Sequence, residues 1–343
     1  MTARLLCHLL TEPSRAPYIT SQQWPSILTV AQAERLAGTL AYRLSGLALP
    51  RAVQSVLDAA RFNADAGRVQ ALWEVEMAQR SLAPLGVPVV LLKGSAFVAT
   101  GLDAGRGRQI GDLDILVPRD RLDDAEAALL MAGWEWVKPD PYDDMYYRRW
   151  MHELPPLIHQ DRDRMIDVHH TILPLTARPR PDAAALIADA VPLSDGLATL
   201  SPADMIVHAA AHLIADGDLE GGLRNLWDID RLVREFSEQD SDFCLTIAEQ
   251  AQRHNLGPQT MRALRLSRDL FDTPLKEYSS PASVSFKSKP SDALFRARLL
   301  ARNGWGQNTH RPLRFAFYIR SHLLRMPPLM LMRHLWIKAR AAK

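Results

Sequence analysis

Cysteine is scarce in this chain, which has only Cys7 and Cys244 in 343 residues. Two cysteines so far apart fit neither a disulfide framework nor the ligand spacing of a zinc site. Long apolar runs are also missing: no charge-free run reaches the roughly 20 residues that span a bilayer. The apolar segment 5–10 is too short for a signal peptide. We therefore expect a cytoplasmic protein without integral membrane association.

Acidic residues are missing from the C-terminal part of the sequence. The net charge of +2 is too small to indicate general affinity for nucleic acid. After Asp292, however, no acidic residue occurs, whereas eleven Arg and Lys follow, interleaved with aromatic residues. This basic tail, residues 295–343, has two interpretations. It binds a polyanion such as RNA or anionic lipid, or it packs on the core with its charges in solvent.

The length of the chain exceeds one typical domain, so we expect a core with helical additions. Apolar spacing predicts helices over residues 27–49 and 51–83, each ended by proline. Residues 201–204 form a capping box that opens another helix, and residues 277–291 resemble a linker. The predicted organisation is a helical region at 1–85, a core at 86–180, and a helical region with the basic tail at 181–343.

The middle of the chain contains a short apolar run, Val87 to Leu92, that is typical of a strand. It ends at Gly94-Ser95, where a small residue and a hydroxyl lead into a helical segment. The backbone N–H groups at the start of a helix favour an anion such as phosphate. Lys93 adds a positive charge beside this turn.

A second strand is predicted over residues 112–117, where polar and apolar residues alternate. Asp112 and Asp114 therefore share one face of it. Two carboxylates so close repel one another, and a cation between them would compensate their charge. Mg²⁺ binds hard oxygen ligands of this kind and completes its shell with water and substrate phosphates.

A hairpin is predicted further along, from strands at residues 154–160 and 165–170. Alternation along its second strand places Asp167 and His169 on one face. Asp167 is a candidate third carboxylate, and its simpler interpretation is a residue that caps the end of the hairpin. His169 has the alternative of a packed, hydrogen-bonded histidine in the core.

The combination of Gly94-Ser95, a helix and Asp112-Leu-Asp114 on a strand resembles the signature of the DNA polymerase β nucleotidyltransferase superfamily. The fuller string, Leu-Leu-Lys93-Gly94-Ser95 followed by Arg108 and Gly111-Asp112-Leu-Asp114-Ile-Leu-Val, resembles a bacterial family described only as uncharacterised nucleotidyltransferases. Residues 96–111 make a longer connection than most of the superfamily has. The resemblance implies an α+β fold, with a small mixed sheet and flanking helices, within helical N- and C-terminal regions.

The resemblance also implies an activity, in which NMP passes from an NTP to an acceptor hydroxyl and pyrophosphate is released. The nucleotide is taken to be ATP; the acceptor, whether RNA, protein, peptide or small molecule, stays open. The roles implied are two Mg²⁺ ions on Asp112, Asp114 and Asp167, and nucleotide binding by Lys93, Gly94, Ser95 and Arg108. His169 and Arg224 are possible substrate contacts.

Simpler interpretations exist for several of these residues. Lys93 and Arg108 could form ion pairs with the aspartates, and Arg224 could pair with Asp228 four residues later in a helix. His208 and His212 also lie four apart, but alanines separate them, which favours helix packing over a metal site. An alternative for the whole chain is a catalytically inactive protein that senses nucleotide or acts as a scaffold.

Overall fold

The apolar run before Lys93 forms one of the inner strands of a mixed sheet. A computed structural model describes residues 2–137, 140–193, 196–276 and 286–332. Within these residues the sheet has seven strands in the order β3-β4-β5-β2-β1-β7-β6. The strands are β1 (Val89–Leu91), β2 (Asp112–Leu116), β3 (Trp134–Trp136), β4 (Leu157–His159), β5 (Met165–His169), β6 (Val191–Pro192) and β7 (Leu197–Thr199).

The central strands β1, β2 and β5 carry fully buried apolar side chains, which explains why they lie in the middle of the sheet. β2 runs antiparallel to β1 and parallel to β5, and β5 pairs with β4 as the predicted antiparallel hairpin. β6 and β7 were not predicted from the sequence. β7 extends the sheet by pairing parallel to β1. The expected α+β fold, a mixed sheet with flanking helices, is confirmed.

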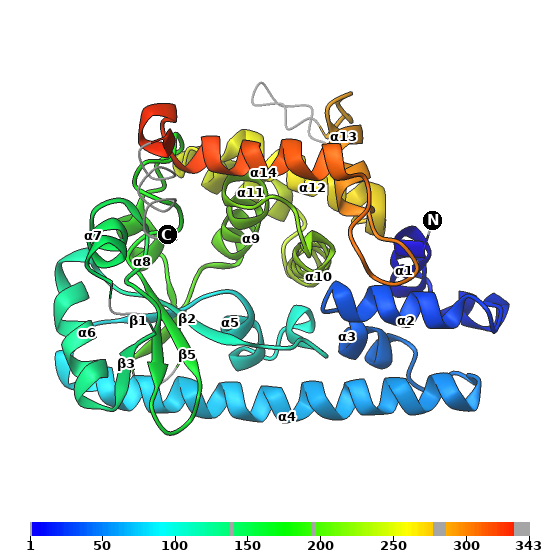
Figure 1. The fold of residues 1–343 in the computed structure, drawn as a ribbon, viewed down its shortest axis with the longest axis horizontal. Helices are drawn as coiled ribbons and strands as arrows, with labels where there is room; N and C mark the ends of the chain where they lie inside the picture. Colours follow the sequence, from blue (N-terminus) through cyan, green and yellow to red (C-terminus); the bar gives the residue numbers. More distant parts are fainter. Residues whose placement is uncertain (1, 138–139, 194–195, 277–285, 333–343) are drawn as a thin grey trace, which may run out of the picture.

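Helices surround the sheet and form most of the chain on either side of it (Figure 1). They are α1 (Thr2–Thr11), α2 (Trp24–Ala33), α3 (Ala37–Arg43), α4 (Arg51–Leu82), α5 (Lys93–Ala99), α6 (Leu122–Met131), α7 (Pro141–Trp150), α8 (Ala183–Ala188), α9 (Pro202–Ala210), α10 (Gly222–Gln239), α11 (Phe243–Arg253), α12 (Gly257–Phe271), α13 (Asp292–Leu299) and α14 (Arg311–Arg325).

The predicted helix over 51–83 is confirmed as α4, which has 32 residues. It runs along one edge of the molecule, beneath the sheet at one end and beneath α3 at the other (Figure 1). Its buried face includes Val53, Leu57 and Val75, whereas Phe62 and Trp73 are exposed. α4 thus ties the N-terminal helices to the sheet.

The single helix predicted over 27–49 was wrong, because the chain breaks into α2 and α3. Arg35 lies between them in the left-handed conformation, with φ of 55°. The Leu36 amide donates to the Ala31 carbonyl at 2.7 Å, which is the bond that closes a helix in a Schellman motif. Glu34, next to the break, is buried and pairs with Arg302 at 2.7 Å. Apolar spacing does not reveal a break that such distant contacts stabilise.

The turn predicted at Gly94-Ser95 lies one residue earlier in the structure. α5 already includes Lys93, whose φ is 48°, so Gly94 and Ser95 belong to the first turn of that helix. The predicted capping box at the start of α9 is confirmed, since the Asp204 amide donates to Ser201 Oγ. No helix in the described part of the chain is long and apolar enough to cross a membrane.

The predicted basic tail is only partly described. α14 packs against the core: Phe317 is buried against Phe295, and Arg320 donates to the Ile214 carbonyl at 2.6 Å. Residues 333–343, and residues 277–285 of the predicted linker, lie outside the described residues. Binding of a polyanion by the tail stays a prediction.

Candidate active site

The three predicted carboxylates meet on one face of the sheet. In the parallel register of β2 and β5, Asp114 lies opposite Asp167, and Asp112 lies one pleat away on the same face as Asp114. Oxygen atoms of the three side chains lie within 4.8 Å of one another. This separation allows one ion or two neighbouring ions to be shared between them.

Asp114 is buried and well supplied with partners. Its Oδ1 accepts from Lys93 Nζ at 2.7 Å and lies 3.0 Å from His169 Nε2. Burial alone would raise the pKa of Asp114, but Lys93 and His169 outweigh it, so the pKa lies well below its usual range. Asp114 therefore stays ionised, and Lys93 stays charged because the same contact raises its pKa.

Asp167 differs from Asp114 in having no such partner. Its Oδ1 is buried and makes no hydrogen bond within the described residues. Burial, followed by the nearby charges of Glu153 and Asp114, raises the pKa of Asp167 to about 7. A buried carboxylate oxygen without a donor is expensive, and a cation is one way to compensate it.

Glu153 and His152 join this face of the sheet and were not predicted from the sequence. Glu153 pairs in an antiparallel bridge with His169, and its Oε2 lies 3.4 Å from His169 Nδ1. The register of β4 and β5 would place Leu154 opposite His169, but one extra residue in the segment containing Pro155 shifts Glu153 into that place. Because of this bulge, the alternation of residues along the strands does not predict the contact of Glu153 with His169.

Ser95 belongs to α5, and Arg108 lines the same cavity as Asp112 and Asp114. Ser95 is buried, and its Oγ makes no hydrogen bond within the described residues. Arg108 passes directly over Gly94, where a Cβ atom would lie only 2.5 Å from Arg108 Nε. Glycine is therefore needed at position 94 for the arginine to approach. Arg108 Nε itself has no hydrogen-bond partner.

The other end of Arg108 belongs to a buried ion network on α10. Arg108 Nη1 and two nitrogens of Arg224 donate to the Asp228 carboxylate. Arg224 also donates to Thr39 Oγ1 at 2.6 Å and to the Ala104 carbonyl at 3.2 Å. The pairing of Arg224 with Asp228 is thus present, while a contact of Arg224 with substrate stays a prediction.

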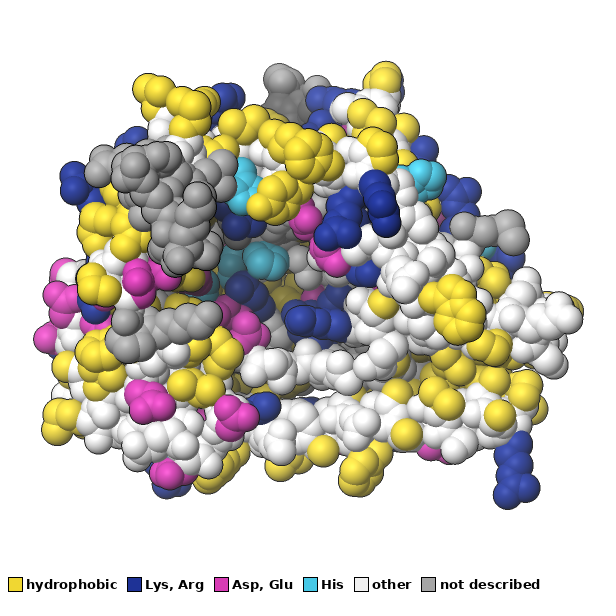
Figure 2. Space-filling model, in the orientation of Figure 1, with side chains coloured by type: hydrophobic (Ala, Val, Ile, Leu, Met, Phe, Trp, Pro, Cys, Tyr) yellow, Lys and Arg dark blue, Asp and Glu magenta, His cyan; other side chains and the backbone are white. Residues whose placement is uncertain are grey.

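A cavity of about 560 Å³ lies between these groups. The molecule is hollowed between the sheet and the helices above it, and Lys, Arg, His and acidic side chains gather there (Figure 2). The cavity is lined by Ala33, Arg35, Lys93, Gly94, Arg108, Gln109, Ile110, Gly111, Asp112, Asp114, His212, Glu220, Gly221, Arg224, Asn225 and Arg302. It therefore offers both oxygen ligands for a cation and cations for an anionic substrate.

A sequence model of a family described as uncharacterised nucleotidyltransferases matches residues 20–272. The chain belongs to this family. No curated protein and no solved structure matches it significantly. The match includes β1 to β7 and the cavity lining apart from Arg302. Membership supports a transferase activity.

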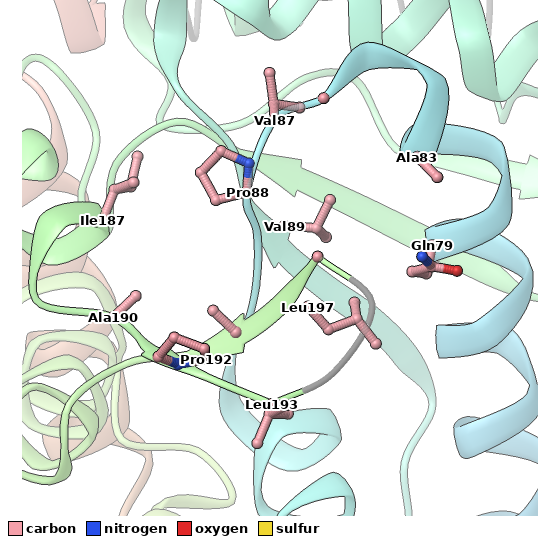
Figure 3. A pocket seen from close by; sticks show the side chains of 13 residues that line it. Gln79, Ala83, Val87, Pro88, Val89, Ile187, Ala190, Pro192, Leu193 and Leu197 are labelled. Carbon is pink, nitrogen blue, oxygen red and sulfur yellow. The ribbon is translucent and has the colours of Figure 1, made fainter.

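A second cavity, of about 610 Å³, does not suit the chemistry of this family. It lies beside β1, β7 and the end of α4, where apolar side chains such as Val89, Ile187 and Leu197 point into it (Figure 3). Gln79 is the polar side chain among the described residues of its lining, and none of those described residues is charged. Such a surface holds neither a metal ion nor a triphosphate, so the cavity at Asp112 is the candidate site.

The His208 and His212 pair does not contribute a metal group. Two groups of three metal-binding side chains occur in the described part of the chain, and neither includes these histidines. His208 is buried, and burial followed by the charge of Lys93 holds its pKa well below the usual range. The packing interpretation agrees with this arrangement.

Proposed function

We propose that this protein is a Mg²⁺-dependent nucleotidyltransferase of the polymerase β type, which transfers NMP from an NTP to an acceptor hydroxyl. The observation that carries the proposal is the convergence of Asp112, Asp114 and Asp167 from two parallel strands, within 4.8 Å, beside Gly94-Ser95. Membership of a nucleotidyltransferase family supports it. The residues concerned belong to the proposed core at 86–180.

The residues present suit magnesium. All three side chains offer hard carboxylate oxygens, and the buried Oδ1 of Asp167 has no donor of its own. When bound, two Mg²⁺ ions would neutralise phosphate charge and stabilise the attacking and leaving oxygens of an in-line displacement. Asp112, which is exposed, faces the open side of the site.

Asp167 is the residue best suited to take the proton of the acceptor hydroxyl. In the metal-free protein burial raises the pKa of Asp167 to about 7, and a bound cation would keep the carboxylate ionised and able to accept that proton. Asp114 is held ionised by Lys93 and His169, so it provides fixed negative charge instead.

The nucleotide phosphates would lie on the opposite wall of the cavity. Arg108 lines this wall, and its Nε, which has no hydrogen-bond partner among the described residues, can donate to a phosphate oxygen. Ser95 follows Gly94 and is buried behind the lining, so its role as a nucleotide contact rests on the resemblance to the family. Lys93 would exchange part of its contact with Asp114 for the phosphate once magnesium neutralises that carboxylate. We take ATP as the nucleotide, with an acceptor hydroxyl on RNA, protein, peptide or a small molecule.

Incubation of the full-length protein with α-labelled NTPs, Mg²⁺ and a cell extract tests this proposal. Label should appear on an acceptor, and Asp112→Asn should lower the rate about 10³-fold or more, because a lost metal contact removes several kcal/mol of transition-state stabilisation. Asp123→Asn is the matched control, since the Asp123 side chain is 95% exposed. It should retain the wild-type rate.

Two results would count against transfer. Binding of NTP with no labelled acceptor from any extract would favour the alternative of a nucleotide sensor or scaffold. Label that persists in Asp112→Asn would mean that the transfer does not use this metal site.

A further inference from the structure

A second group of metal-binding side chains lies next to the aspartates. His152, Glu153 and His169 each offer a ligand atom, and these atoms lie within 4.8 Å of one another. Glu153 Oε2 is 3.4 Å from His169 Nδ1 and 3.6 Å from His152 Nε2. The two imidazole rings face one another with centroids 5.2 Å apart. Two nitrogens and an oxygen thus surround one small space.

The hydrogen bonds of His169 leave its inner nitrogen unexplained. Nε2 of His169 lies 3.0 Å from Asp114 Oδ1, and since a carboxylate only accepts, Nε2 carries the hydrogen. Nδ1 is buried in a residue that is 1% exposed, and it makes no hydrogen bond. Its contact with Glu153 is longer than an ordinary N–H···O hydrogen bond of about 2.7–3.2 Å. A cation between Nδ1 and Glu153 Oε2 would supply the partner that Nδ1 lacks among the described residues.

The distances from Glu153 to the two histidines suit a tetrahedral ion. With metal–ligand distances of about 2.1 Å, neighbouring ligands of a tetrahedron lie about 3.4 Å apart. The two contacts of Glu153 Oε2, at 3.4 and 3.6 Å, agree with this value. We propose that His152, Glu153 and His169 form a further metal site, for Zn²⁺, distinct from the magnesium site on the aspartates.

The ligand types separate the two sites chemically. Imidazole nitrogen suits zinc and other transition metals, whereas Mg²⁺ prefers oxygen ligands and keeps much of its water. Glu153 supplies the negative charge that favours a cation, and Lys93 donates to Asp114. Three protein ligands leave a fourth position for water or substrate.

Asp114 connects this site to the proposed active site. A histidine that binds a metal usually donates its other N–H to a carboxylate, which fixes the orientation of the ring. His169 has this arrangement, with Nδ1 toward Glu153 and Nε2 toward Asp114. A zinc ion would therefore fix the position of the Asp114 carboxylate through His169. The zinc site does not depend on the proposed function, because its occupancy is measured without nucleotide.

Metal binding by the full-length protein provides the test. The protein is stripped with a chelator and titrated with Zn²⁺ by calorimetry in excess Mg²⁺, which saturates the aspartates. We expect one Zn²⁺ per chain. Co²⁺ in place of Zn²⁺ should show the intense visible absorption of a tetrahedral ion. Glu153→Gln and His152→Asn should each weaken Zn²⁺ binding about 100-fold or more, because each removes a direct ligand.

Matched variants distinguish this site from its neighbours. His170→Gln changes an adjacent histidine that instead contacts the Met151 carbonyl, so it should bind Zn²⁺ like wild type. Asp114→Asn should weaken Zn²⁺ binding about 10- to 100-fold through His169, whereas Asp112→Asn should leave it unchanged. Thermal unfolding of each variant checks that it is folded.

Three outcomes would overturn the proposal. No Zn²⁺ binding by the wild-type protein would mean that His169 is simply a protonated partner of Glu153. Loss of Zn²⁺ in Asp112→Asn together with wild-type binding in Glu153→Gln would place the ion on the aspartates. Octahedral Co²⁺ spectra would exclude the tetrahedral site. None of these results depends on whether nucleotide is transferred.

Discussion

Two buried clusters of charge lie at the same cavity, one on the sheet and one on α10. At Asp228 both carboxylate oxygens are bonded to a cation, since Arg108 donates to Oδ2 and Arg224 to Oδ1, and Arg224 makes further bonds to Thr39 and Ala104. At Asp167 this is not the case. Its buried Oδ1 has no donor among the residues that the structure describes, and the other charges close to it include the carboxylates of Glu153 and Asp114.

The difference between the two clusters distinguishes charged residues that stabilise the fold from charged residues that bind a ligand. A buried ion pair is costly unless every group is bonded, so a cluster that only stabilises the fold should resemble the one at Asp228. A buried cluster of charges without partners is tolerated when the rest of the fold holds it in place and a bound ligand supplies the opposite charge. The carboxylates on β2 and β5 fit the second description, so the proposed metal site lies there rather than at α10.

Substitution of Asp228 should have the largest effect on stability. Asp228→Asn leaves Arg108 and Arg224 buried without their counter-charge, and breaking a buried pair costs about 3–5 kcal/mol. Chemical denaturation should show this loss. Asp112→Asn, which changes an exposed side chain, should stay within about 0.5 kcal/mol of wild type. Similar losses in both variants would remove the distinction between the two clusters.

Substitution of Asp167 should stabilise the metal-free protein, but only at high pH. The folded state holds a proton on Asp167 up to a pKa of about 7, while the unfolded state releases it near the ordinary value of 3.8. Wild-type stability therefore falls between these pH values as pH rises. Asp167→Asn removes the unfavourable charge, so at pH 8 with a chelator it should gain on the order of 1–3 kcal/mol.

The pH series is its own control for Asp167. Near pH 5 the wild-type side chain is already protonated, so Asp167→Asn and wild type should unfold at nearly the same temperature. Mg²⁺ should stabilise wild type more at pH 8 than at pH 5. A variant that is less stable than wild type at pH 8 would show that Asp167 has a partner after all.

Local patterns in the sequence predicted much of the fold and part of the candidate site. Apolar spacing predicted α4 within one residue at its C-terminal end, and alternation placed Asp112 and Asp114 on one face of a strand. Asp167 was predicted on the second strand of a hairpin, but its place opposite Asp114 depends on the parallel register of β2 and β5. The resemblance to a family, rather than alternation, suggested that the two strands meet.

The contacts that alternation could not predict are irregular or distant in sequence. Glu153 reaches His169 only through the extra residue before β4, and a regular hairpin would have placed Leu154 there. Arg108 and Asp228 are 120 positions apart, and no local signal connects them. Arg108 forms an ion pair, but its partner is Asp228 rather than the predicted Asp112 or Asp114, and its contact with phosphate stays a prediction.

Gly94→Ala should displace Arg108, which lies between the Asp228 cluster and the carboxylates. Of the substitutions at Asp228, Asp167 and Gly94, it should change the free energy of unfolding least. In Gly94→Ala the new Cβ would lie 2.5 Å from Arg108 Nε, so the arginine must move away from the phosphate position. Loss of one charged contact should raise the Kd for NTP about tenfold, which corresponds to about 1.4 kcal/mol. Stability should change by about 1 kcal/mol or less, since alanine favours a helix more than glycine does.

Gly111→Ala is the matched control for this substitution. Gly111 lines the same cavity, but a Cβ there would meet nothing within 4 Å and its φ is not positive. Both variants are titrated with a fluorescently labelled NTP, and the fluorescence change gives the Kd. Only Gly94→Ala should bind the nucleotide more weakly than wild type. Equal NTP affinities of the two variants would mean that Arg108 only pairs with Asp228 on α10. Lys93 and Ser95 would then be the remaining proposed phosphate contacts.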